Sequence, residues 1–459
     1  MFLLLCMLIV IGSTLSLFSL STTAAPRRDW IPSVNFGGAC QKQEVLDDVA
    51  PTEVLQVEPW DSSRYVLGSP TAKYRDNLRN DTNYITSWAN AGFTNQFISL
   101  VNMIYLGMLT DRVPIVPPFA PDHHITREAG IITFGEIFNL THLRATLRIP
   151  ILEWRDVKDL PSSSALQPYD AVEVEDIGCW STRQESSNSA TPAETHIRHL
   201  GIDPSYTRTP GYTRMTPGRD DSHVIFSKLA AVVYPKRPYR REMENLPLMV
   251  ESRYHQHRLP PDPQLTCFDI LYYGTSGAEV FEWRFGFSPV WNMVGKHLLF
   301  NQRLVERSRG YLRRAFSLGE HESIPPFIAI HIRQGDFGLQ CNLPGHCLGS
   351  VDLFVDAVKR QEKQLLASKG MVVGRWLVSS DSTDPKFWDE VNALGWSYFD
   401  HEAEQTLEKC GEWQTPLVDM VAHSLAAGFV GTEDSTFSLV GGRRVEDWNN
   451  GSYELVTQH

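Results

Sequence analysis

The stretch from Phe327 to Phe337, FIAIHIRQGDF, decides how the second half of this chain folds. Its apolar beginning has the composition of a buried β-strand, and the strand ends abruptly at Arg333. About a hundred residues later, the segment 431–438, GTEDSTFS, again passes from an apolar run to polar residues. In open α/β sheets, ligands bind beyond the carboxyl ends of the strands. We therefore expect both polar strand ends to belong to one ligand site.

The residue types at these two strand ends suit a phosphate group. Arg333 offers a planar guanidinium that matches phosphate oxygens, although Asp336 could simply pair with it through a tight turn. Ser435 and Thr436 are expected to open a helix, whose first N–H groups attract anions, but both are also common N-cap residues. Asp381 ends another predicted strand and fits a helix cap better than a ligand. The expected ligand is a nucleoside diphosphate.

A chain of 459 residues exceeds the size at which one hydrophobic core keeps growing, so we expect two lobes. The first lobe is predicted at 81–320, with a loop insertion at about 155–225, because that segment is rich in Ser, Thr, Asp, Arg and Pro. The second lobe is predicted at 321–459. Residues 26–80 are expected to form a stem or loosely packed lead-in.

Strands and helices are expected to alternate in both lobes. In the first, apolar residues at helical spacing predict a helix that ends near Leu109, and Val113–Val116 predicts a short strand. In the second, strands separated by helical patterns of about 10–15 residues predict a parallel, doubly wound sheet. Its strands are expected at 327–333, 375–380, 396–399 and 428–431.

The N-terminus predicts entry into the secretory pathway. Phe2–Leu20 is an uncharged, mostly apolar run, followed by Arg27 and Arg28. We interpret residues 1–25 as a signal peptide or a signal anchor, and a buried core helix is the less favoured alternative. The protein is therefore expected in the lumen of the endoplasmic reticulum or Golgi, either anchored by this single-pass segment or soluble after its cleavage.

The cysteine count agrees with that compartment. Cys6 lies in the apolar run, and the remaining even number can form three disulfides, with fifteen pairings allowed. We favour Cys341–Cys347, because these two flank a turn-rich loop. The six candidates are Cys40, Cys179, Cys267, Cys341, Cys347 and Cys410. Glycosylation sequons occur at Asn80, Asn139 and Asn450.

Charge and motif spacing argue against two other classes of protein. The chain carries 42 basic and 54 acidic residues, a formal charge of −12, which disfavours a nucleic-acid-binding surface. No Asp-x-Asp triplet occurs in the sequence. The adjacent pair His123 and His124 would point apart on a strand, with no cluster of carboxylates nearby. We expect no metal requirement and no other cofactor.

Three ordered motifs together resemble the GDP-fucose protein O-fucosyltransferase superfamily and the related α1,6-fucosyltransferases, in a form similar to fungal members. They are Gly92–Gln96 (GFTNQ), His331–Arg333 with Asp336, and Ser435–Ser438 (STFS). The resemblance implies the GT-B architecture, in which two Rossmann-like lobes with parallel sheets face a cleft. It also implies GDP-fucose as donor on the second lobe, an acceptor on the first lobe, inversion at the anomeric carbon and no metal.

The resemblance also implies residue roles. Arg333 would contact the donor phosphates and the breaking glycosidic bond, and Asn95 would lie by the reacting centre; these two are the expected catalytic residues. His331 either bonds to the departing diphosphate or fills a satisfied core position, and Asp419 matches an acidic residue at the nucleoside half. The expected donor-binding residues are Gly92, Phe93, His331, Asp419, Ser435, Thr436 and Phe437.

One departure from the family concerns the catalytic base. The thrombospondin-repeat type has a glutamate two residues before the loop phenylalanine, where this chain has Ala91. The base is therefore unassigned, and the acceptor can be a protein or a glycan hydroxyl. Two alternatives stay open: a GT-B transferase that uses another nucleotide sugar, and a catalytically silent lumenal protein that binds a sugar or nucleotide.

Overall fold

The apolar run before Arg333 forms β10 (Ile328–Ile332), the middle strand of a five-stranded sheet in this computed structural model. The structure describes residues 60–161, 173–235, 246, 248–335, 337 and 350–457. All neighbouring strands of this sheet are parallel, in the order β12-β11-β10-β13-β14. The other four strands are β11 (Trp376–Ser380), β12 (Ser397–Tyr398), β13 (Gly428–Thr432) and β14 (Ser452–Val456).

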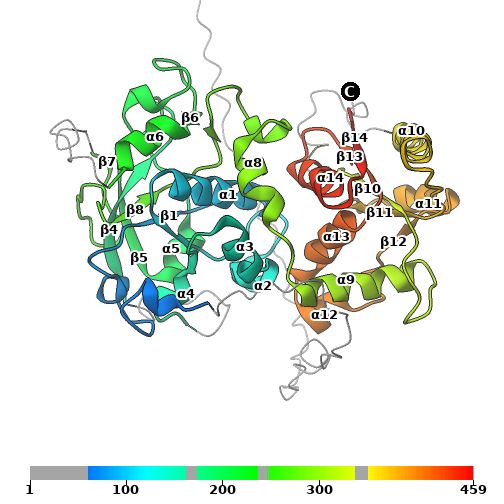
Figure 1. Ribbon diagram of the computed structural model, residues 1–459, viewed down its shortest axis with the longest axis horizontal. Coiled ribbons are helices and arrows are strands. Elements are labelled where there is room, and N and C mark those ends of the chain that lie inside the picture. Colours follow the sequence, from blue (N-terminus) through cyan, green and yellow to red (C-terminus); the bar gives the residue numbers. More distant parts are fainter. Residues whose placement is uncertain are drawn as a thin grey trace, which may run out of the picture. The chain divides into compact units, whose positions relative to one another are not determined.

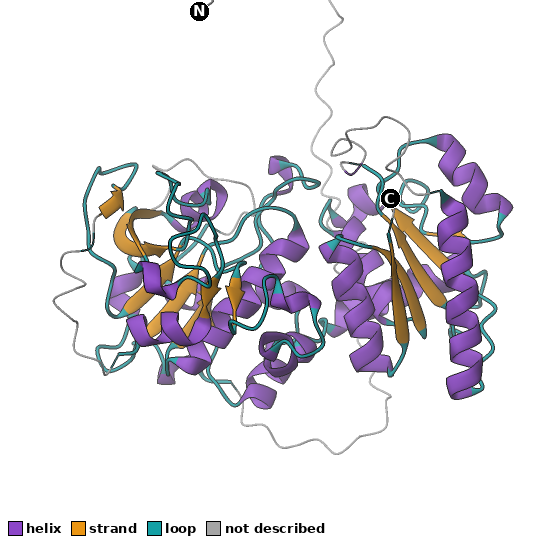
Figure 2. Cartoon of the chain, turned by 90° about the horizontal axis from the view of Figure 1, so that it is seen from above, coloured by secondary structure: helices purple, strands orange, loops and turns teal. Residues whose placement is uncertain are grey.

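Helices cover both faces of this sheet, as Figure 2 shows beside the C-terminus. Alternate residues of β10 face opposite cores: Ala329 belongs to one apolar cluster, and Ile328 and Ile330 belong to another. Both faces are buried, so the strand is apolar throughout, as expected for a parallel sheet. The first face is covered by α9 (Gln302–Ala315), α13 (Gln414–Ser424) and α14 (Thr436–Asn449), and the second by α10 (Val351–Lys369) and α11 (Pro385–Ala393).

Helix ends in this half follow the sequence signals for capping. The hydroxyl of Ser350 accepts from the backbone N–H of Asp352 at 3.2 Å at the start of α10, and Gly370, with φ of +66°, ends that helix. Asp384 caps α11, which begins at Pro385. A short helix, α12 (Thr406–Cys410), precedes α13.

The first half contains a seven-stranded sheet in the order β3-β2-β1-β8-β4-β5-β7. Figure 1 labels its strands β1, β4, β5, β7 and β8. Its neighbouring strands are parallel except for the edge strand β7, which is antiparallel to β5. The strands are β1 (Tyr84–Ser87), β2 (Val113–Val116), β3 (Leu152–Glu153), β4 (Glu175–Ser181), β5 (Ile202–Arg208), β7 (Leu248–Val250) and β8 (Leu265–Phe268). A separate pair is β6 (Val224–Ile225) with β9 (Gly274–Thr275).

The helices of this half are mostly short, apart from α1 (Phe93–Leu109), which packs on β1 and β2. The others are α2 (Phe134–Ile137), α3 (Leu140–Leu147), α4 (Trp154–Val157), α5 (Glu194–Leu200), α6 (Phe226–Val233) and α8 (Pro289–Met293). Single 3₁₀ turns lie at Ser62–Arg64, Tyr74–Asn77, Arg127–Ala129, Gly211–Thr213, Glu282–Arg284 and Gly295–His297. Two parallel sheets with packed helices confirm the predicted fold class.

The prediction of a loop insertion at about 155–225 is wrong. That segment contributes β4 and β5, two neighbouring strands inside the first sheet, and the helix α5. Polar residues of β5 are buried and hydrogen-bonded instead. Asp203 accepts backbone N–H bonds from Tyr254 and His255, and the hydroxyl of Ser205 donates to the carbonyl of Leu259. Burial with satisfied polar groups is compatible with a central strand.

The predicted stem at 26–80 is wrong over its described part, residues 60–80. Tyr74 and Leu78 are buried in the same core as strands of the first sheet. The backbone N–H of Tyr74 donates to Glu175 of β4 at 2.7 Å. This segment therefore packs as part of the fold.

The lobe boundary predicted at 320 also needs correction. Helix α9 lies before that position, yet it packs on α13 of the second half, where the hydroxyl of Ser308 donates to the carbonyl of Val418 at 2.9 Å. The amphipathic pattern of α9 was visible in the sequence, but the partner of its apolar stripe was not.

A disulfide between Cys179 of β4 and Cys267 of β8 joins two neighbouring strands. Cys410 is also disulfide-bonded. The favoured pair Cys341–Cys347 lies outside the described residues, as do Cys40 and the apolar run Phe2–Leu20. Within the described ranges, the structure has no helix that is both long and apolar enough to cross a membrane.

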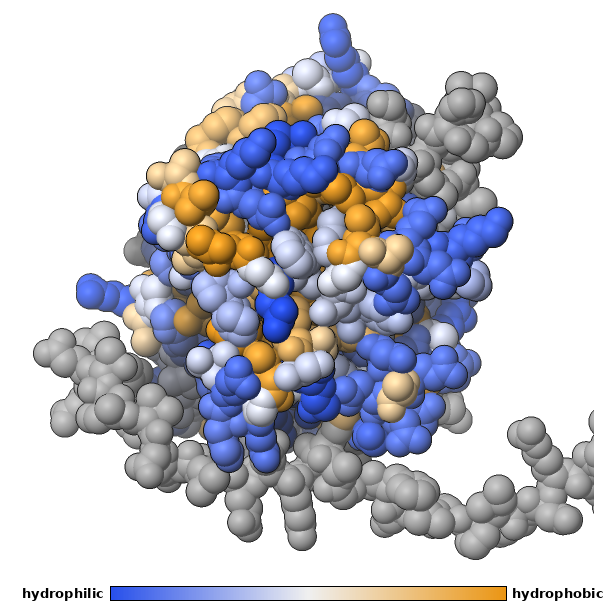
Figure 3. Space-filling view, turned by 90° about the vertical axis from the view of Figure 1, so that its right-hand side faces the viewer, coloured by the Kyte–Doolittle hydropathy of each residue, from blue (hydrophilic) through white to orange (hydrophobic). Residues whose placement is uncertain are grey.

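Figure 3 shows the face of the molecule that lies at the right of Figure 1. Hydrophilic side chains cover much of it, with apolar side chains gathered between them. Exposed apolar residues of the second half include Leu353, Leu366, Val372 and Leu394. Such a mixture is ordinary, because apolar atoms contribute more than half of a typical folded surface.

Candidate functional site

The second sheet has a topological switch point between β10 and β13. From β10 the chain builds outward through β11 to β12 on one side, whereas β13 and β14 lie on the other side. Ligands of doubly wound sheets bind outside the carboxyl ends of the two strands where the order reverses. Arg333 directly follows β10, and Thr432 is the last residue of β13. The two stretches singled out in the sequence therefore meet at this point.

Hydrogen bonds fix the two strand ends to each other. The hydroxyl of Thr432 accepts from the backbone N–H of Arg333 at 2.9 Å and donates to the carbonyl of His331 at 3.2 Å. The backbone N–H of Thr432 donates to the hydroxyl of Ser438 in α14 at 2.9 Å. Any side chain at Gly431 would collide with Ser438, so only glycine lets α14 approach the strand this closely. The start of α14 is thus held next to Arg333.

The guanidinium of Arg333 has partners on both of its sides. One terminal nitrogen lies 2.6 Å from Asp381, which follows β11, and the other lies 2.6 Å from the Nε2 atom of His124 in the first half. The arginine side chain is 15% exposed. Asp381 also accepts from the backbone N–H of Gln334 at 2.8 Å, and a side chain at Gly335 would collide with its carboxylate. Asp336, the other candidate partner, lies outside the described residues.

His331 is buried and electrically neutral at physiological pH. Its pKa is lowered to about 3, chiefly by burial and to a smaller extent by the positive charge of Arg333. Its Nδ1 atom lies 2.7 Å from the hydroxyl of Ser438, and its ring centroid lies 4.8 Å from that of Phe437. Of the two roles that the sequence left open, this geometry favours a satisfied core position. Phe437 is half-buried beside it and forms one wall of the same region.

The N-terminus of α14 is capped from within. The hydroxyl of Ser435 accepts from the backbone N–H of Ser438 at 3.3 Å, and Ser435 is buried. The hydroxyl of Thr436 instead donates to the side-chain oxygen of Asn95 at 2.9 Å. This bond connects the first turns of α14 and α1, and it brings together two residues that the motifs had singled out separately.

The loop before α1 is shaped by Gln96 and Asp122. The side-chain amide of Gln96 donates to the carbonyls of Ala91 and Ala120, at 2.8 Å and 2.7 Å, and its oxygen accepts from the N–H of Ala120. Ala91 has a φ of +64°, and its backbone N–H donates to the carboxylate of Asp122 at 2.7 Å. An acidic group therefore lies beside Ala91.

Gly92 and Phe93 lie at the start of α1. Gly92 is its N-cap, and a side chain there would meet no atom within 4 Å. The ring of Phe93 packs against Phe119 at 4.6 Å and lies 6.4 Å from that of Trp413 on the second half. The structure therefore gives Phe93 a packing contact between the two halves, and it leaves open space at Gly92.

Asp419 lies in the middle of α13, with its carboxylate 3.3 Å from the Nε2 atom of His401. The Nδ1 atom of His401 lies 3.0 Å from the hydroxyl of Thr406, which in turn lies 2.7 Å from that of Tyr311. Asp419 and His401 are both about one-fifth exposed, so the pair is accessible to a ligand. Asp419 therefore belongs to a hydrogen-bonded network of His401, Thr406 and Tyr311, which is separate from the contacts of Arg333 and Asn95 among the described residues.

Sequence reasoning missed three polar residues of this region. Asp381 was interpreted as a helix cap, but Asp384 caps α11 and Asp381 contacts Arg333. His124 was considered only as half of a metal pair, and Asp122 was not considered. Asp122 and His124 could have been found from their position after β2, because ligands bind where residues follow the carboxyl ends of parallel strands.

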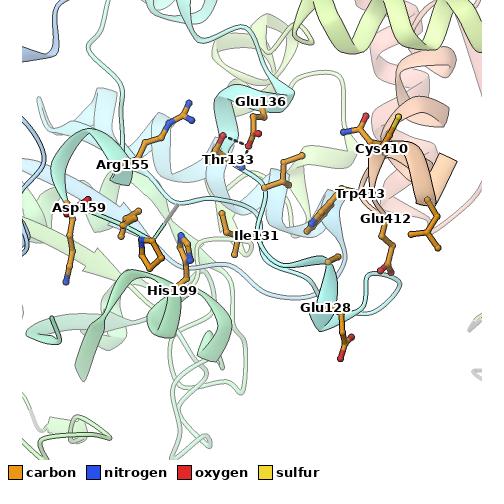
Figure 4. A pocket seen from close by; sticks show the side chains of 18 of the residues that line it. Glu128, Ile131, Thr133, Glu136, Arg155, Asp159, His199, Cys410, Glu412 and Trp413 are labelled. Carbon is orange, nitrogen blue, oxygen red and sulfur yellow. Dashed lines mark hydrogen bonds between the residues drawn. The ribbon is translucent and has the colours of Figure 1, made fainter. Parts of the chain in front are cut away.

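A separate cavity of about 810 Å³ lies next to Trp413 (Figure 4). It is lined from the first half by residues such as Glu128, Thr133 and Glu136 and from the second by Glu412 and Trp413. None of the nine site residues predicted from the sequence lines it. Thr126, near its rim, donates two hydrogen bonds to Glu412, at 2.7 Å and 2.6 Å, and so ties the two halves together.

Comparison with known proteins gave structural likenesses only. No family model and no curated protein matches the sequence. POFUT1 in its apo form superposes with a TM-score of 0.49 and 15% identity, over 83% of this chain and 99% of that one. POFUT1 in complex with GDP-fucose superposes with a TM-score of 0.47 and 16% identity, over 82% of this chain and 98% of that one. NodZ α-1,6-fucosyltransferase co-crystallised with GDP superposes with a TM-score of 0.39 and 14% identity, over 80% of this chain and 92% of that one.

At these identities and TM-scores, the likenesses carry no argument about the chemistry of this chain. The functional conclusion therefore has to come from the residues at the switch point.

Proposed function

We propose that this protein is an inverting glycosyltransferase that moves fucose from GDP-fucose to a hydroxyl of a protein or glycan acceptor in the secretory pathway. The observation that carries the proposal is the position of Arg333. It lies at the switch point of a doubly wound sheet, next to the N-terminus of α14 and in contact with His124 of the first half. A cation and a helix N-terminus at such a place suit a diphosphate.

The chemistry follows from the charge that develops on the leaving group. As the bond between the anomeric carbon and the β-phosphate oxygen breaks, GDP leaves with an additional negative charge on that oxygen. Arg333 would neutralise it, while the backbone N–H groups of Thr436 and Phe437, in the first turn of α14, would hold the phosphate. Asp381 holds the guanidinium in place before the donor binds, which lowers the cost of organising the site.

Donor and acceptor halves would be aligned by the hydrogen bond between Thr436 and Asn95. It fixes the first turn of α1 against the first turn of α14. Asn95, whose side chain is half-buried, would then lie by the anomeric carbon, and Phe437 and Asp419 would contact the nucleoside half of the donor. Catalysis of this kind needs no metal ion, because protein groups supply the positive charge.

For the acceptor we assign the base to Asp122. The acceptor hydroxyl would give its proton to this carboxylate as its oxygen forms the new bond to the anomeric carbon, on the face opposite the departing GDP. Support comes from its fixed position beside Ala91, in the same loop system that carries Asn95 and His124. The side chain is 41% exposed, so an acceptor can reach it.

The proposed compartment rests on the apolar leader and on the disulfide between Cys179 and Cys267. Disulfides form and persist mainly in oxidising compartments. All three sequon asparagines, Asn80, Asn139 and Asn450, are exposed, so each is accessible for glycosylation.

Calorimetry in excess EDTA tests the donor assignment. GDP should bind at least about tenfold more tightly than UDP, and GDP-fucose should release GDP faster than GDP-mannose does. The anomeric configuration of the product, measured by NMR, should be inverted relative to the donor. Tighter binding of UDP would favour a transferase for another nucleotide sugar, and binding of GDP without turnover on any acceptor would favour a silent binding protein.

A further inference from the structure

A cluster of three metal-ligating side chains lies at the opposite edge of the first sheet. Asp176 is the second residue of β4, so it lies near the amino end of that strand, whereas the proposed active site lies beyond carboxyl ends. Its two carboxylate oxygens lie 2.9 Å from the Nδ1 atoms of His255 and His257, one oxygen for each ring. The ligand atoms of all three residues lie within 4.8 Å of one another.

The loop that carries the two histidines is held in place by other groups. Asp203 pairs with Asp176 in the register of β4 and β5, and its carboxylate accepts the backbone N–H groups of Tyr254 and His255, at 3.0 Å and 2.6 Å. The backbone N–H of Ser252 donates to the carbonyl of His257, and the N–H of His257 donates back to the hydroxyl of Ser252, both at 2.9 Å. Both imidazoles are thus presented to Asp176 by a closed, hydrogen-bonded turn.

These distances suit a transition-metal ion. Zinc binds imidazole nitrogen and carboxylate oxygen at about 2.0–2.2 Å, so neighbouring ligands of a tetrahedral site lie about 3.3 Å apart. The spacing of 2.9 Å between Asp176 and each ring is close to that value. The carboxylates of Asp176 and Asp203, whose nearest oxygen lies 3.5 Å from Nδ1 of His255, offset the charge of a divalent cation.

The exposure of the two histidines would also let a metal ion reach this site from solution. The side chain of His257 is 59% exposed and that of His255 is 32% exposed, while Asp203 behind them is 2% exposed. One side of the cluster therefore faces solvent, which would leave a coordination position to water.

We propose that Asp176, His255 and His257 bind one divalent transition-metal ion, of which Zn²⁺ is the best match, at a structural site remote from the transferase centre. Binding moves the proton of each ring from Nδ1 to Nε2, so that Nδ1 can donate its lone pair to the metal. The ion joins the loop 252–257 to β4 and β5. The inference does not depend on the proposed transferase activity.

Titration of the metal-stripped full chain with Zn²⁺ tests the proposal, with Co²⁺ absorption as a report on ligand geometry. The wild type should bind one equivalent and melt at a higher temperature with Zn²⁺ present. His257→Asn keeps a group that can hydrogen-bond to Asp176 but ligates zinc poorly, so it should weaken Zn²⁺ binding at least tenfold. Asp176→Asn should do the same, and His321→Asn, a change at an exposed histidine, should have no effect.

Two results would contradict the proposed metal site. In one, the wild type binds no stoichiometric Zn²⁺, which leaves the cluster as a carboxylate bonded to two imidazole N–H groups. In the other, Zn²⁺ binds but His257→Asn and Asp176→Asn bind it as tightly as the wild type, which places the ion elsewhere. Circular dichroism of each variant without metal shows whether the fold is kept.

Discussion

The hydroxyl of Thr436 donates a hydrogen bond to the side-chain oxygen of Asn95, 2.9 Å away, across 341 positions of sequence. Each residue stands in the first turn of its helix, Asn95 in α1 and Thr436 in α14. The bond therefore places the N-terminus of a helix from one sheet against the N-terminus of a helix from the other. Both ends carry free backbone N–H groups, so they create a region that attracts anions.

Removing the hydroxyl of Thr436 should disturb activity more than stability. Thr436→Val keeps the shape of the side chain but loses the bond, and it leaves the oxygen of Asn95 without this donor. We expect kcat to fall about tenfold and stability to change by about 1 kcal/mol. Thr436→Ser restores the hydroxyl and should recover most of the rate, while Thr383→Val, at an exposed threonine, serves as control. Equal rates for Thr436→Val and the wild type would show that the hydrogen bond to Asn95 does not align the two halves for catalysis.

Arg333 should be required for turnover and dispensable for folding. Arg333→Ala removes the charge that neutralises the leaving diphosphate, so kcat should fall by about two to three orders of magnitude. Donor affinity should weaken less, because charge on the leaving oxygen grows only as the bond breaks. Arg333→Lys keeps the charge but cannot reach Asp381 and His124 together, and should also be impaired.

Released GDP measures that turnover, with circular dichroism as the folding control and Arg309→Ala, on the exposed face of α9, as the matched substitution. Turnover by Arg333→Ala near the wild-type rate would show that the active site has been placed wrongly.

The protein should lose stability in mild acid through its buried histidines. Burial lowers the pKa of His331 and His423 to about 3, and that of His196 and His199 to about 4. An unfolded histidine takes up a proton below about pH 6.5, whereas these folded ones do not. Their contribution is complete above pH 6.5 and is lost as the pH falls toward 3 or 4. At pH 5, each of the two most shifted groups accounts for about 2 kcal/mol.

Urea unfolding at pH 7 and pH 5 checks this expectation. His423→Gln can keep a bond to the hydroxyl of Ser379, which lies 2.7 Å from the Nε2 atom of His423, but it has no titrating ring. Its stability should therefore change less between the two pH values than that of the wild type. The exposed control His321→Gln should behave like the wild type. If His423→Gln loses as much stability as the wild type, the acid sensitivity has another source.

The sequence predicted the second half well because its strands are buried on both faces. Strands β10, β11 and β13 each contain a short apolar run, and each lies within one or two residues of the range expected. The edge strand β14 was missed because SYELV mixes polar and apolar residues. Edge strands need no continuous apolar run, so periodicity gives little signal there.

The strands of the first half were harder to predict, because polar residues in them interrupt the apolar pattern. β5 contains Asp203, Pro204 and Ser205, which look like a loop until their hydrogen-bond partners in the segment 252–259 are known. A sequence motif singled out Arg333 as a candidate, and the structure places it at the end of β10. The contact of Asp381 with Arg333 joins two distant segments, and no local sequence pattern predicts such a contact.

The side chain of Arg444 should matter for its volume more than for its charge. It is fully buried in α14, and its guanidinium carbon lies 4.4 Å from the ring centroid of Phe300 and 5.0 Å from that of Phe97. Its side-chain nitrogens have no hydrogen-bond partner among the described residues, and burial lowers its pKa to about 9. Arg444→Ala leaves a cavity and should cost about 2–5 kcal/mol.

Arg444→Met fills most of that space without an unpaired charge, so it should be at least about 1 kcal/mol more stable than Arg444→Ala. Denaturant unfolding of both variants beside Arg309→Ala measures the difference. Equal losses for Met and Ala would show instead that attraction between the cation and the surrounding rings holds α14 in place.

Asp122 should act as the base toward the acceptor. Asp122→Asn keeps an oxygen that can accept the N–H of Ala91, so the loop should hold its shape, but the amide cannot take a proton. We expect the transfer rate to fall by about two to four orders of magnitude, with GDP affinity unchanged in calorimetry. Asp389→Asn, at an exposed position of α11, should leave both the transfer rate and the affinity for GDP as in the wild type. A variant Asp122→Asn that transfers at the wild-type rate would leave the reaction without a base from this loop.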